Sequence, residues 1–353
     1  MKILYSIQAT GNGHIARAIE LMPYLQAYGQ VDVLLSGSNS SLSVPFNVTY
    51  RSKGLSLFYG NYGGLHYAKM LQHCNLYTLW NQARHLPVKA YDLIINDFDC
   101  VTALACKLQR IPSVQMGHQA SFQSSKTPRP AKQNIMGEFI LRNYAAATQY
   151  VGLHFQPYDH FILPPVIKNA IVESKPNNHG HITVYLGHYS NAALLPHLFQ
   201  LTNYEFHVFS KEVTATQKIN NVLLQPVSNK AFTESLIHSL GVITGAGFET
   251  PAEAMYLNKK LLCLPIKGQY EQLCNAAALA ELGVTIVTTI NAQFHLTVND
   301  WLQEQNTIQN TYFLPTHTIV NRAMHLAQQP APQPQQQNNR IGNAYDDSWL
   351  LGY

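Results

Sequence analysis

The sequence has few charged residues, since Asp, Glu, Lys and Arg together make up only 12% of its 353 residues. Lys and Arg outnumber Asp and Glu by 23 to 19, which gives a net charge of +4, and no run of like charges occurs. A nucleic-acid partner is therefore not expected, because nucleic-acid-binding proteins concentrate basic residues on one face. The slightly positive balance suits ligands that carry phosphate, or an anionic membrane surface, without establishing either.

Paired cysteines and long apolar runs are also missing. The five cysteines, Cys74, Cys100, Cys106, Cys263 and Cys274, include no C-x-x-C pair, so we expect reduced, mostly buried thiols and a cytoplasmic protein. The first residues contain too short an apolar run for a secretory signal, and no window reaches the roughly 18 apolar residues of a membrane span. The histidines show no compact ligand spacing, so we predict neither a structural metal nor a cofactor.

Apolar residues, which make up 46% of the chain, are sufficient for a buried core in each of two domains. Short β-branched runs alternate with helical patterns over nearly the whole length, and this alternation indicates parallel sheets covered by helices. Strands are expected at 2–7, 31–35, 91–96, 113–116 and 150–155, and then at 182–186, 205–209, 222–224, 241–244, 261–264 and 285–287. Helices are expected at 15–28, 101–109, 192–201, 230–239, 252–257 and 272–282.

Proline marks the boundary between the two halves. Residues 156–179 contain four prolines, and proline interrupts both helices and sheets. We therefore expect an N-terminal domain at 1–160, a linker at 161–179 and a C-terminal domain at 180–328. The stretch at 329–353 begins with Gln, Pro, Asn and Ala, a composition that buries little apolar surface, and is expected to form a loose tail.

The strongest functional signal begins with a glycine-rich turn. An expected strand is followed by Gly245, Ala246, Gly247 and Phe248, and then by a helix. Two glycines one residue apart let the backbone approach an anion closely, and a helix N-terminus presents free N–H groups and the positive end of its dipole. A diphosphate fits this description, although many tight turns from strand to helix bind nothing.

Glu253, one helical turn further on, has two interpretations. Thr250 and Pro251 precede it as in a capping box with proline at the first helical position. A carboxylate at this place would equally accept hydrogen bonds from the two hydroxyls of a ribose. The local pattern alone slightly favours the capping role.

Polar residues follow the next expected strand. Gln269, Glu271 and Gln272 come shortly after the strand ends at Pro265. Clustered amides and a carboxylate suit a polyhydroxylated ligand, because each sugar hydroxyl both donates and accepts a hydrogen bond. A solvated helix start is the plain alternative for such a stretch taken alone.

These motifs occur in a fixed order. The sequence reads TGAGFETPAEA at 244–254, LP at 264–265, GQYEQLCNA at 268–276 and LGV at 282–284. This order resembles the donor-binding region of glycosyltransferases of the GT-B fold, and most of all the branch that holds the lipid II N-acetylglucosaminyltransferase and the UDP-glycosyltransferases. The resemblance implies an α/β protein with two doubly wound Rossmann-like domains that face each other across a cleft.

The resemblance also implies roles for single residues in the donor site. It implies diphosphate contacts at Gly245, Ala246, Gly247 and Phe248, a ribose contact at Glu253, and sugar-hydroxyl contacts at Glu271 and Gln272, with Gln269 beside them. The nucleotide base would be held by backbone at Val227, with Phe232 as a weaker candidate that is more often a core residue. Gly187 matches a loop near the donor phosphates.

A second glycine turn follows the first strand and contains Gly13 and His14. It is not a dinucleotide fingerprint, because alanine occupies the third glycine position. It resembles the Gly-x-Gly-His loop of the same glycosyltransferases, in which a neutral histidine at the cleft accepts a proton from the acceptor hydroxyl. A carboxylate commonly orients such a base, and Asp97 is the first choice and Asp99 the second. Arg17, one turn further on, is expected either to steady a phosphate or to be solvated.

The predicted function is that of an inverting, metal-independent glycosyltransferase. It would move a hexosyl or N-acetylhexosaminyl group from a nucleotide sugar, with UDP favoured, to a hydroxyl of a glycan, lipid or small molecule; inversion and metal independence follow from the resemblance. The alternatives are a nucleotide-sugar 2-epimerase on the same fold and a non-catalytic nucleotide-sugar-binding protein. Residues 118–143 are expected to form a solvated loop, with a role in acceptor binding or in peripheral contact with the inner face of the membrane as alternatives.

Overall fold

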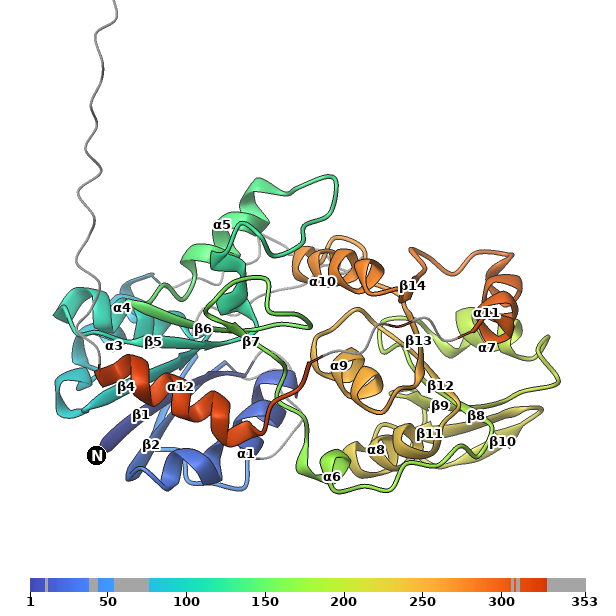
Figure 1. The fold of residues 1–353 in the computed structure, drawn as a ribbon, viewed down its shortest axis with the longest axis horizontal. Helices are drawn as coiled ribbons and strands as arrows, with labels where there is room; N and C mark the ends of the chain where they lie inside the picture. Colours follow the sequence, from blue (N-terminus) through green and yellow to red (C-terminus); the bar gives the residue numbers. More distant parts are fainter. Residues whose placement is uncertain (10–11, 38–43, 54–75, 306–307, 309–311, 329–353) are drawn as a thin grey trace, which may run out of the picture.

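The computed structural model describes residues 1–9, 12–37, 44–53, 76–305, 308 and 312–328, and within them the chain forms two lobes, each built around a sheet (Figure 1). The first lobe contains β1 (Lys2–Gln8), α1 (Asn12–Gln26), β2 (Gln30–Ser36), β3 (Tyr50–Ser52), α3 (Leu76–His85), η1 (Val88–Ala90), β4 (Leu93–Asp97), α4 (Cys100–Gln109), β5 (Val114–Gly117), η2 (Gln119–Gln123), α5 (Ile135–Asn143), β6 (Gln149–Leu153), β7 (Ile162–Leu163) and α12 (Thr316–Gln328).

The second lobe follows a short connecting helix, α6 (Asn169–Val172). It contains β8 (His181–Tyr185), α7 (Asn191–Leu198), β9 (Glu205–Ser210), β10 (Gln217–Ile219), β11 (Val222–Pro226), α8 (Asn229–His238), β12 (Gly241–Thr244), α9 (Glu249–Tyr256), β13 (Lys260–Cys263), α10 (Tyr270–Glu281), β14 (Thr285–Ile286) and α11 (Phe294–Gln303). All the strands expected from the sequence are present. The three that it does not predict, β3, β7 and β10, are short strands at sheet edges.

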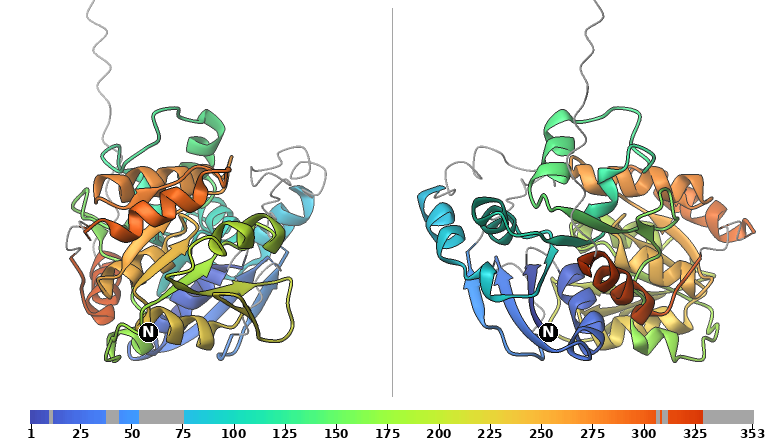
Figure 2. Two further views of the ribbon diagram at one scale, coloured as in Figure 1. Left: turned by 90° about the vertical axis from the view of Figure 1, so that its right-hand side faces the viewer. Right: turned by 60° about the vertical axis from the view of Figure 1, so that its left-hand side comes forward.

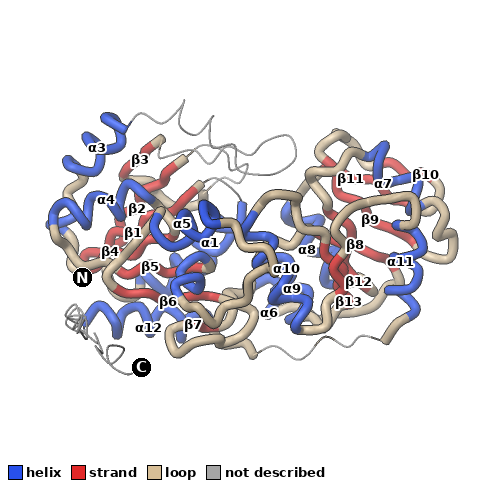
Figure 3. Tube along the Cα trace, turned by 90° about the horizontal axis from the view of Figure 1, so that it is seen from above, coloured by secondary structure: helices blue, strands red, loops and turns tan. Residues whose placement is uncertain are grey.

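Both sheets have doubly wound topology. The first has the order β3-β2-β1-β4-β5-β6-β7, and its pairings are parallel. The second has the order β10-β11-β9-β8-β12-β13-β14 and is parallel except where β10 pairs with β11. The order reverses between β1 and β4 and between β8 and β12, and open parallel sheets bind ligands where this reversal separates the loops. Seen from above, α1, α9 and α10 lie between the two sheets (Figure 3).

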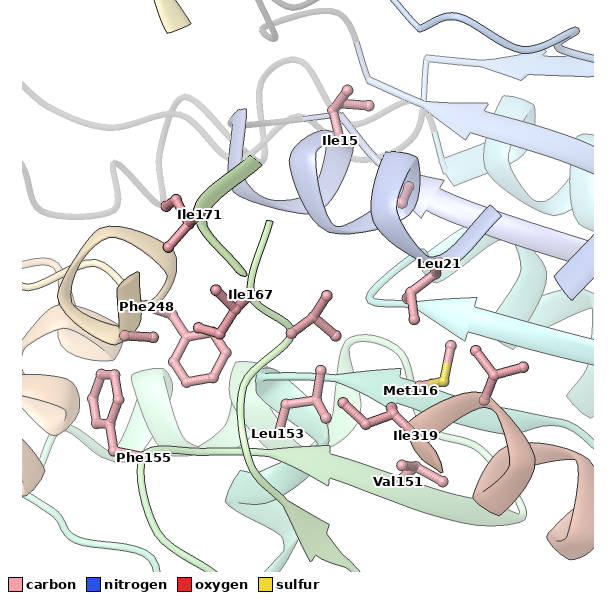
Figure 4. Packing of buried hydrophobic residues seen from close by; sticks show 14 of the residues in the cluster. Ile15, Leu21, Met116, Val151, Leu153, Phe155, Ile167, Ile171, Phe248 and Ile319 are labelled. Carbon is pink, nitrogen blue, oxygen red and sulfur yellow. The ribbon is translucent and has the colours of Figure 1, made fainter. Parts of the chain in front are cut away.

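The apolar core continues from one lobe into the other. Every residue of β1 after Lys2 is buried, as expected for a parallel strand covered by helices on both faces. Where the lobes meet, Phe155 packs against Phe248, with ring centroids 5.2 Å apart, and Ile167 of the connecting segment belongs to the same cluster (Figure 4). The lobes are therefore joined by apolar contact as well as by the chain.

The connection between the lobes is more ordered than its prolines indicate. Residues 162–163 form β7, which pairs with β6 at the edge of the first sheet, although the pattern assigns them to the linker. Proline excludes a central strand, but it is tolerated next to an edge strand, whose outer backbone groups have no partner to lose. The first lobe therefore extends beyond residue 160.

Helix α12 belongs with the first sheet. Its buried face, with Ile319, Val320, Ala323 and Met324, packs against α1, β5 and β6 (Figure 2). The pattern assigns residues up to 328 to the C-terminal domain because of their position in the sequence, and this packing corrects that assignment. The expected tail at 329–353 lies outside the described residues.

The segment 118–143 is not a solvated loop throughout. It contains η2 and α5, and Phe122 and Leu141 are buried in a cluster with Tyr270 and Cys274 of α10. The segment therefore forms part of the contact between the lobes. Cys74 lies outside the described residues, and the other four cysteines are buried and form no disulfide with one another.

Asp99 starts helix α4. Its carboxylate accepts hydrogen bonds from the backbone N–H groups of Val101 at 3.3 Å and Thr102 at 2.7 Å. Its own N–H donates to the Asn96 side chain at 2.7 Å, which fixes the strand-to-helix turn. Asp99 is thus an N-cap, a position where a short acceptor side chain satisfies N–H groups that the helix leaves free.

We expect Asp99→Ala to lower the free energy of unfolding by about 1–2 kcal/mol, because the first turn of α4 loses its acceptor. Asp99→Asn keeps an acceptor oxygen and should retain most of that stability. Urea denaturation followed by circular dichroism measures both, and equal losses in the two variants would contradict the capping role.

Ile319→Ala should destabilise the first lobe by about 2–4 kcal/mol, because it leaves a cavity between α12 and the sheet. Leu296→Ala on α11 is the matched control, since Leu296 is 51% exposed and its loss should change the unfolding free energy by less than about 0.5 kcal/mol. The same denaturation experiment compares them. If Ile319→Ala behaved like the control, the docking of α12 on the first sheet would be wrong.

Candidate active site

The switch point of the first sheet brings His14 and Asp97 together, as the sequence predicts. His14 lies in the first turn of α1, and Asp97 ends β4 in register with Ile7 of β1. His14 Nδ1 is 2.9 Å from Asp97 Oδ1. When a neutral ring donates its Nδ1 proton to this carboxylate, Nε2 carries the lone pair that a general base requires.

Arg17 completes this cluster and is not solvated, in contrast to one of the two expectations for it. Its Nε donates to Asp97 Oδ2 at 3.1 Å and its Nη2 donates to Asp97 Oδ1 at 2.8 Å. Its Nη1 donates to Glu249 Oε1 of the second lobe at 2.6 Å. Arg17 and His14 share a helix face because they are three residues apart, and that spacing is the sequence signal for their contact.

The charges of Arg17 and Asp97 hold each other in the ionised state. Burial alone would raise the pKa of the Asp97 carboxyl, but the charge of Arg17 and the contact with His14 outweigh burial and hold that pKa below its usual value. Burial likewise would lower the pKa of Arg17, and Asp97 and Glu249 raise it above its usual value. Asp97 therefore stays ionised over the pH range in which a histidine titrates.

Two backbone features give the cluster its shape. A Cβ on Gly117, at the end of β5, would lie 2.7 Å from Asp97 Oδ1, so only glycine leaves room for the carboxylate. Phe98 has a φ of 59°, a left-handed conformation that is costly for a bulky residue and is found mainly at functional sites. This turn directs Asp97 toward His14 and leaves Asp99, the second choice for orienting His14, as the cap of α4.

In the second lobe, the turn at 245–248 presents its backbone to open space. A Cβ on Gly247 would meet nothing within 4 Å, and a Cβ on Gly245 would lie 3.6 Å from Gln272 Oε1. Helix α9 begins directly after Phe248, which makes no side-chain capping bond. The N-terminus of α9 and the turn together match the geometry of a phosphate-binding loop.

Glu253 does not close a capping box. Because α9 begins at Glu249, Thr250 lies inside the helix and not at its N-cap, so the capping prediction is wrong. The Glu253 carboxylate is buried and lies 3.0 Å from Lys168 Nζ. Burial raises the pKa of Glu253, and the charge of Lys168 opposes that rise only in part. Lys168, which the sequence pattern does not single out, lines the adjacent cavity.

A cavity of about 330 Å³ lies between the lobes. Val227, the expected base contact, is in its wall, and so are Phe232 and Tyr185, whose rings pack edge to face. Phe232 is therefore more than a core residue. Gly187 is not among the lining residues, although a Cβ on it would lie 2.9 Å from Tyr185 Oη.

A second cavity, of about 230 Å³, shares Gly13, Gly247, Phe248 and Glu249 with the first. Its wall unites the histidine cluster, the glycine turn and the polar residues after β13. The lining residues are Gly13, His14, Arg17, His118, Gln119, Gly247, Phe248, Glu249, Gln269, Glu271 and Gln272. The predicted base and the predicted sugar-binding residues thus face one space, although they come from opposite halves of the chain.

Gln119 enters that space from the first lobe. Its Nε2 donates to Glu271 Oε1 at 3.0 Å, while its Oε1 is buried without a hydrogen-bond partner among the described residues. Gln119 thus lies beside Glu271 in the cavity wall. Gln119 follows the end of β5, and its place after a strand is the signal that would have found it.

His118, next to Gln119, forms a contact between the lobes. Its ring stacks on Phe248 with centroids 4.0 Å apart, and its Nε2 lies 2.8 Å from Asn275 Oδ1 of α10. Asn275 in turn donates to the carbonyl of Ala246 at 3.1 Å, which holds the glycine turn in place. Burial lowers the pKa of His118.

The described residues contain neither a candidate metal site nor a membrane-spanning helix. Among the described residues, no group of three or more His, Cys, Asp or Glu side chains is arranged to hold a metal ion. No helix there is both long enough and apolar enough to cross a membrane.

Comparison with known proteins gives the family. A family model described as glycosyl transferase family 1 matches residues 1–304, whereas no curated protein matches the sequence. Among solved structures, the spinosyn forosaminyltransferase SpnP is 15% identical with a TM-score of 0.54, over 93% of this chain and 100% of that one. UGT89C1 of Arabidopsis thaliana, in complex with UDP, is 14% identical with a TM-score of 0.57, over 94% and 95%. SnogD from Streptomyces nogalater is 14% identical with a TM-score of 0.51, over 93% and 99%.

At these identities the likeness to solved structures establishes the fold, which is two doubly wound domains with a cleft between them. The family match extends over both lobes and includes the histidine cluster and the glycine turn. The chain therefore belongs to glycosyl transferase family 1 and is a glycosyltransferase of the GT-B fold.

Proposed function

We propose that the enzyme transfers a hexosyl or N-acetylhexosaminyl group from a UDP-sugar to an acceptor hydroxyl, in a single displacement that inverts the anomeric centre. The observation that carries this proposal is the cavity whose wall holds both His14 and the second half of the glycine turn, Gly247 and Phe248. A base and an anion-binding helix N-terminus that face one space are what such a displacement needs. UDP as the nucleotide is supported by fold relatives whose structures contain UDP or UDP-2-fluoro-glucose.

In the proposed reaction, the acceptor oxygen attacks the anomeric carbon while the bond from that carbon to the diphosphate oxygen breaks. The hydroxyl proton goes to His14 Nε2, and UDP leaves with the electron pair of the broken bond. Asp97 stabilises the imidazolium that forms, through the 2.9 Å contact with Nδ1. The free N–H groups of the turn and of the α9 N-terminus stabilise the charge on the leaving diphosphate. The proposal includes no divalent cation, in keeping with the family resemblance.

The larger cavity is the proposed nucleotide site. The base would lie against Val227, with the Phe232 ring beside it. We propose that the pair of Lys168 and Glu253 faces the ribose as a unit, because Lys168 lines the cavity and Glu253 holds its ammonium group in place.

The smaller cavity is the proposed sugar site. Glu271 and Gln272 come from α10, and Gln119 of the first lobe lies beside them and donates to Glu271. Because this pocket holds both donors and acceptors of hydrogen bonds, it can form hydrogen bonds with several hydroxyls of one sugar. The glycosyl group would then lie with its anomeric carbon between His14 and the glycine turn.

Replacement of His14 by alanine should reduce kcat by about 10²- to 10⁴-fold, the usual contribution of a general base, and leave the affinity for UDP unchanged. His160→Ala is the control, because the His160 side chain is 82% exposed and lies outside both cavities. The assay measures transfer from a panel of nucleotide sugars to hydroxyl acceptors, in buffer with EDTA, and the anomeric configuration of the product is read by NMR. Full activity of His14→Ala, or turnover of the donor to an epimer without acceptor, would rule out the proposal.

Replacement of Glu271 by alanine should weaken the binding of a UDP-sugar by about tenfold, since a hydrogen bond to a charged group is lost, without changing the affinity for UDP. Glu234→Ala on α8 is the control, with a side chain that is 72% exposed. Isothermal titration calorimetry with UDP and with UDP-sugars measures both affinities. An equal loss for UDP and the UDP-sugar would contradict a role in sugar recognition.

A further inference from the structure

Two polar groups compete for one nitrogen of His14. Its Nδ1 lies 2.9 Å from Asp97 Oδ1 and 3.0 Å from Arg17 Nη2, and these two atoms are themselves 2.8 Å apart. A guanidinium nitrogen can only donate a hydrogen bond, and a carboxylate oxygen can only accept one. Nδ1 therefore cannot satisfy both neighbours. When Nδ1 carries a proton, it donates that proton to Asp97, and its N–H then faces an N–H of Arg17, which is unfavourable. When Nδ1 carries no proton, it accepts a hydrogen bond from Arg17, and its lone pair then faces the carboxylate oxygen, which is also unfavourable.

These two arrangements are the two tautomers of neutral His14, and only one of them is a base toward the cavity. When the proton is on Nδ1, Nε2 has the free lone pair that can take the proton of an acceptor hydroxyl. When the proton is on Nε2, the lone pair is on Nδ1 and is bound by Arg17. The position and charge of the Arg17 guanidinium therefore decide whether the His14 ring can serve as a base toward the cavity.

The other end of that guanidinium is held by the opposite lobe. Arg17 Nη1 donates to Glu249 Oε1 at 2.6 Å, and Glu249 is the first residue of α9. Gly13 packs so closely against Glu249 that a Cβ on Gly13 would lie 2.5 Å from its Oε2. Glu249 thus draws the positive charge of Arg17 away from Nδ1, while Asp97 holds the opposite side.

We propose that Arg17 and Glu249 are positioning residues that select the tautomer of His14, with the contact to Glu249 favouring the proton on Nδ1. This inference rests on the proposed role of His14 as the general base. Because Glu249 belongs to the second lobe, the base becomes competent only when the two lobes are in contact. When the lobes are apart, His14 would then be a poor base, so it would not activate water to hydrolyse the donor.

The other ionisable groups around the cluster are held in one charge state or neutralised. Tyr5 of β1 faces Asp97, and burial raises its pKa, so the phenol stays neutral. Glu253 of α9 faces Glu249 and is neutralised by Lys168. His118, after β5, also faces Glu249, and burial lowers its pKa, which favours the neutral ring. Among the described residues, the charged groups in hydrogen-bond contact with Nδ1 are Asp97 and Arg17, and Arg17 in turn contacts Glu249.

The test reads the tautomer directly and needs no substrate. Two-bond ¹H–¹⁵N correlation spectra of the full chain with ¹⁵N-labelled histidine distinguish the two tautomers, and the His14 signals are those that His14→Gln removes. In Glu249→Gln, which keeps the shape and removes the charge, we expect a larger share of the Nε2–H tautomer than in the wild type. Glu234→Gln is the matched control and should leave the tautomer ratio unchanged.

Substitution of Arg17 should act in the opposite direction. Arg17→Gln removes the cation that opposes a proton on Nδ1, so we expect the Nδ1–H tautomer alone. Since this variant leaves the buried Asp97 without its cation and could unfold, Arg17→Lys is the second variant. Its ammonium group still neutralises Asp97, but it lacks the planar fork that reaches both Asp97 and His14, so we again expect the Nδ1–H tautomer.

A larger share of the Nε2–H tautomer in Glu249→Gln, with the Nδ1–H tautomer retained in an Arg17 variant, would support the proposal. An unchanged tautomer ratio in Glu249→Gln would overturn it, and so would a shift toward Nε2–H in both Glu249→Gln and Arg17→Lys, which general loosening of the site would produce. The outcome is separate from that of the proposed reaction. If His14→Ala kept its activity, His14 would not be the base, yet the tautomer measurement would still report whether Arg17 and Glu249 control the ring.

Discussion

A carboxylate without access to water has to be neutralised by its neighbours. The groups around Asp97, at the centre of the molecule, are arranged to meet this requirement. An unpaired buried charge costs several kcal/mol, and Arg17 and His14 meet that cost from one face of α1. The absence of a side chain at Gly117 and the left-handed backbone of Phe98 give the carboxylate its place. The start of α1, the turn after β4 and the end of β5 thus meet at one buried charge.

The same cluster ties the two lobes together. Arg17 reaches Glu249 across the cleft, and Phe248, the residue before Glu249, packs on Phe155 and His118 of the first lobe. The glycine turn, whose backbone faces the cavities, is therefore fixed from both sides. Neither half of the chain contains a complete site, because the groups suited to proton transfer and those suited to anion binding come from opposite lobes.

The sequence predicts well what depends on regular patterns. Alternating apolar runs locate the central strands, and the glycine turns locate the loops at both switch points, so the meeting of His14 with Asp97 follows from strand order. Contacts set by packing in three dimensions were not predictable in this way. Glu253 matches a capping box in the sequence, but the start of α9 and the approach of Lys168 decide otherwise. Arg17, Gln119 and Lys168 acquire partners only when distant segments meet. The apolar spacing of α12 is visible in the sequence, whereas the lobe on which it packs is not.

The return of α12 to the first lobe has a mechanical consequence. The chain passes from one lobe to the other twice, between β7 and β8 and again between α11 and α12. A second connection reduces the relative rotations of the two lobes that a single connection would allow. Opening of the cleft would separate Arg17 from Glu249, and closure would have to restore that contact. Two connections between the same two lobes favour a closure that returns both halves of the site to one register.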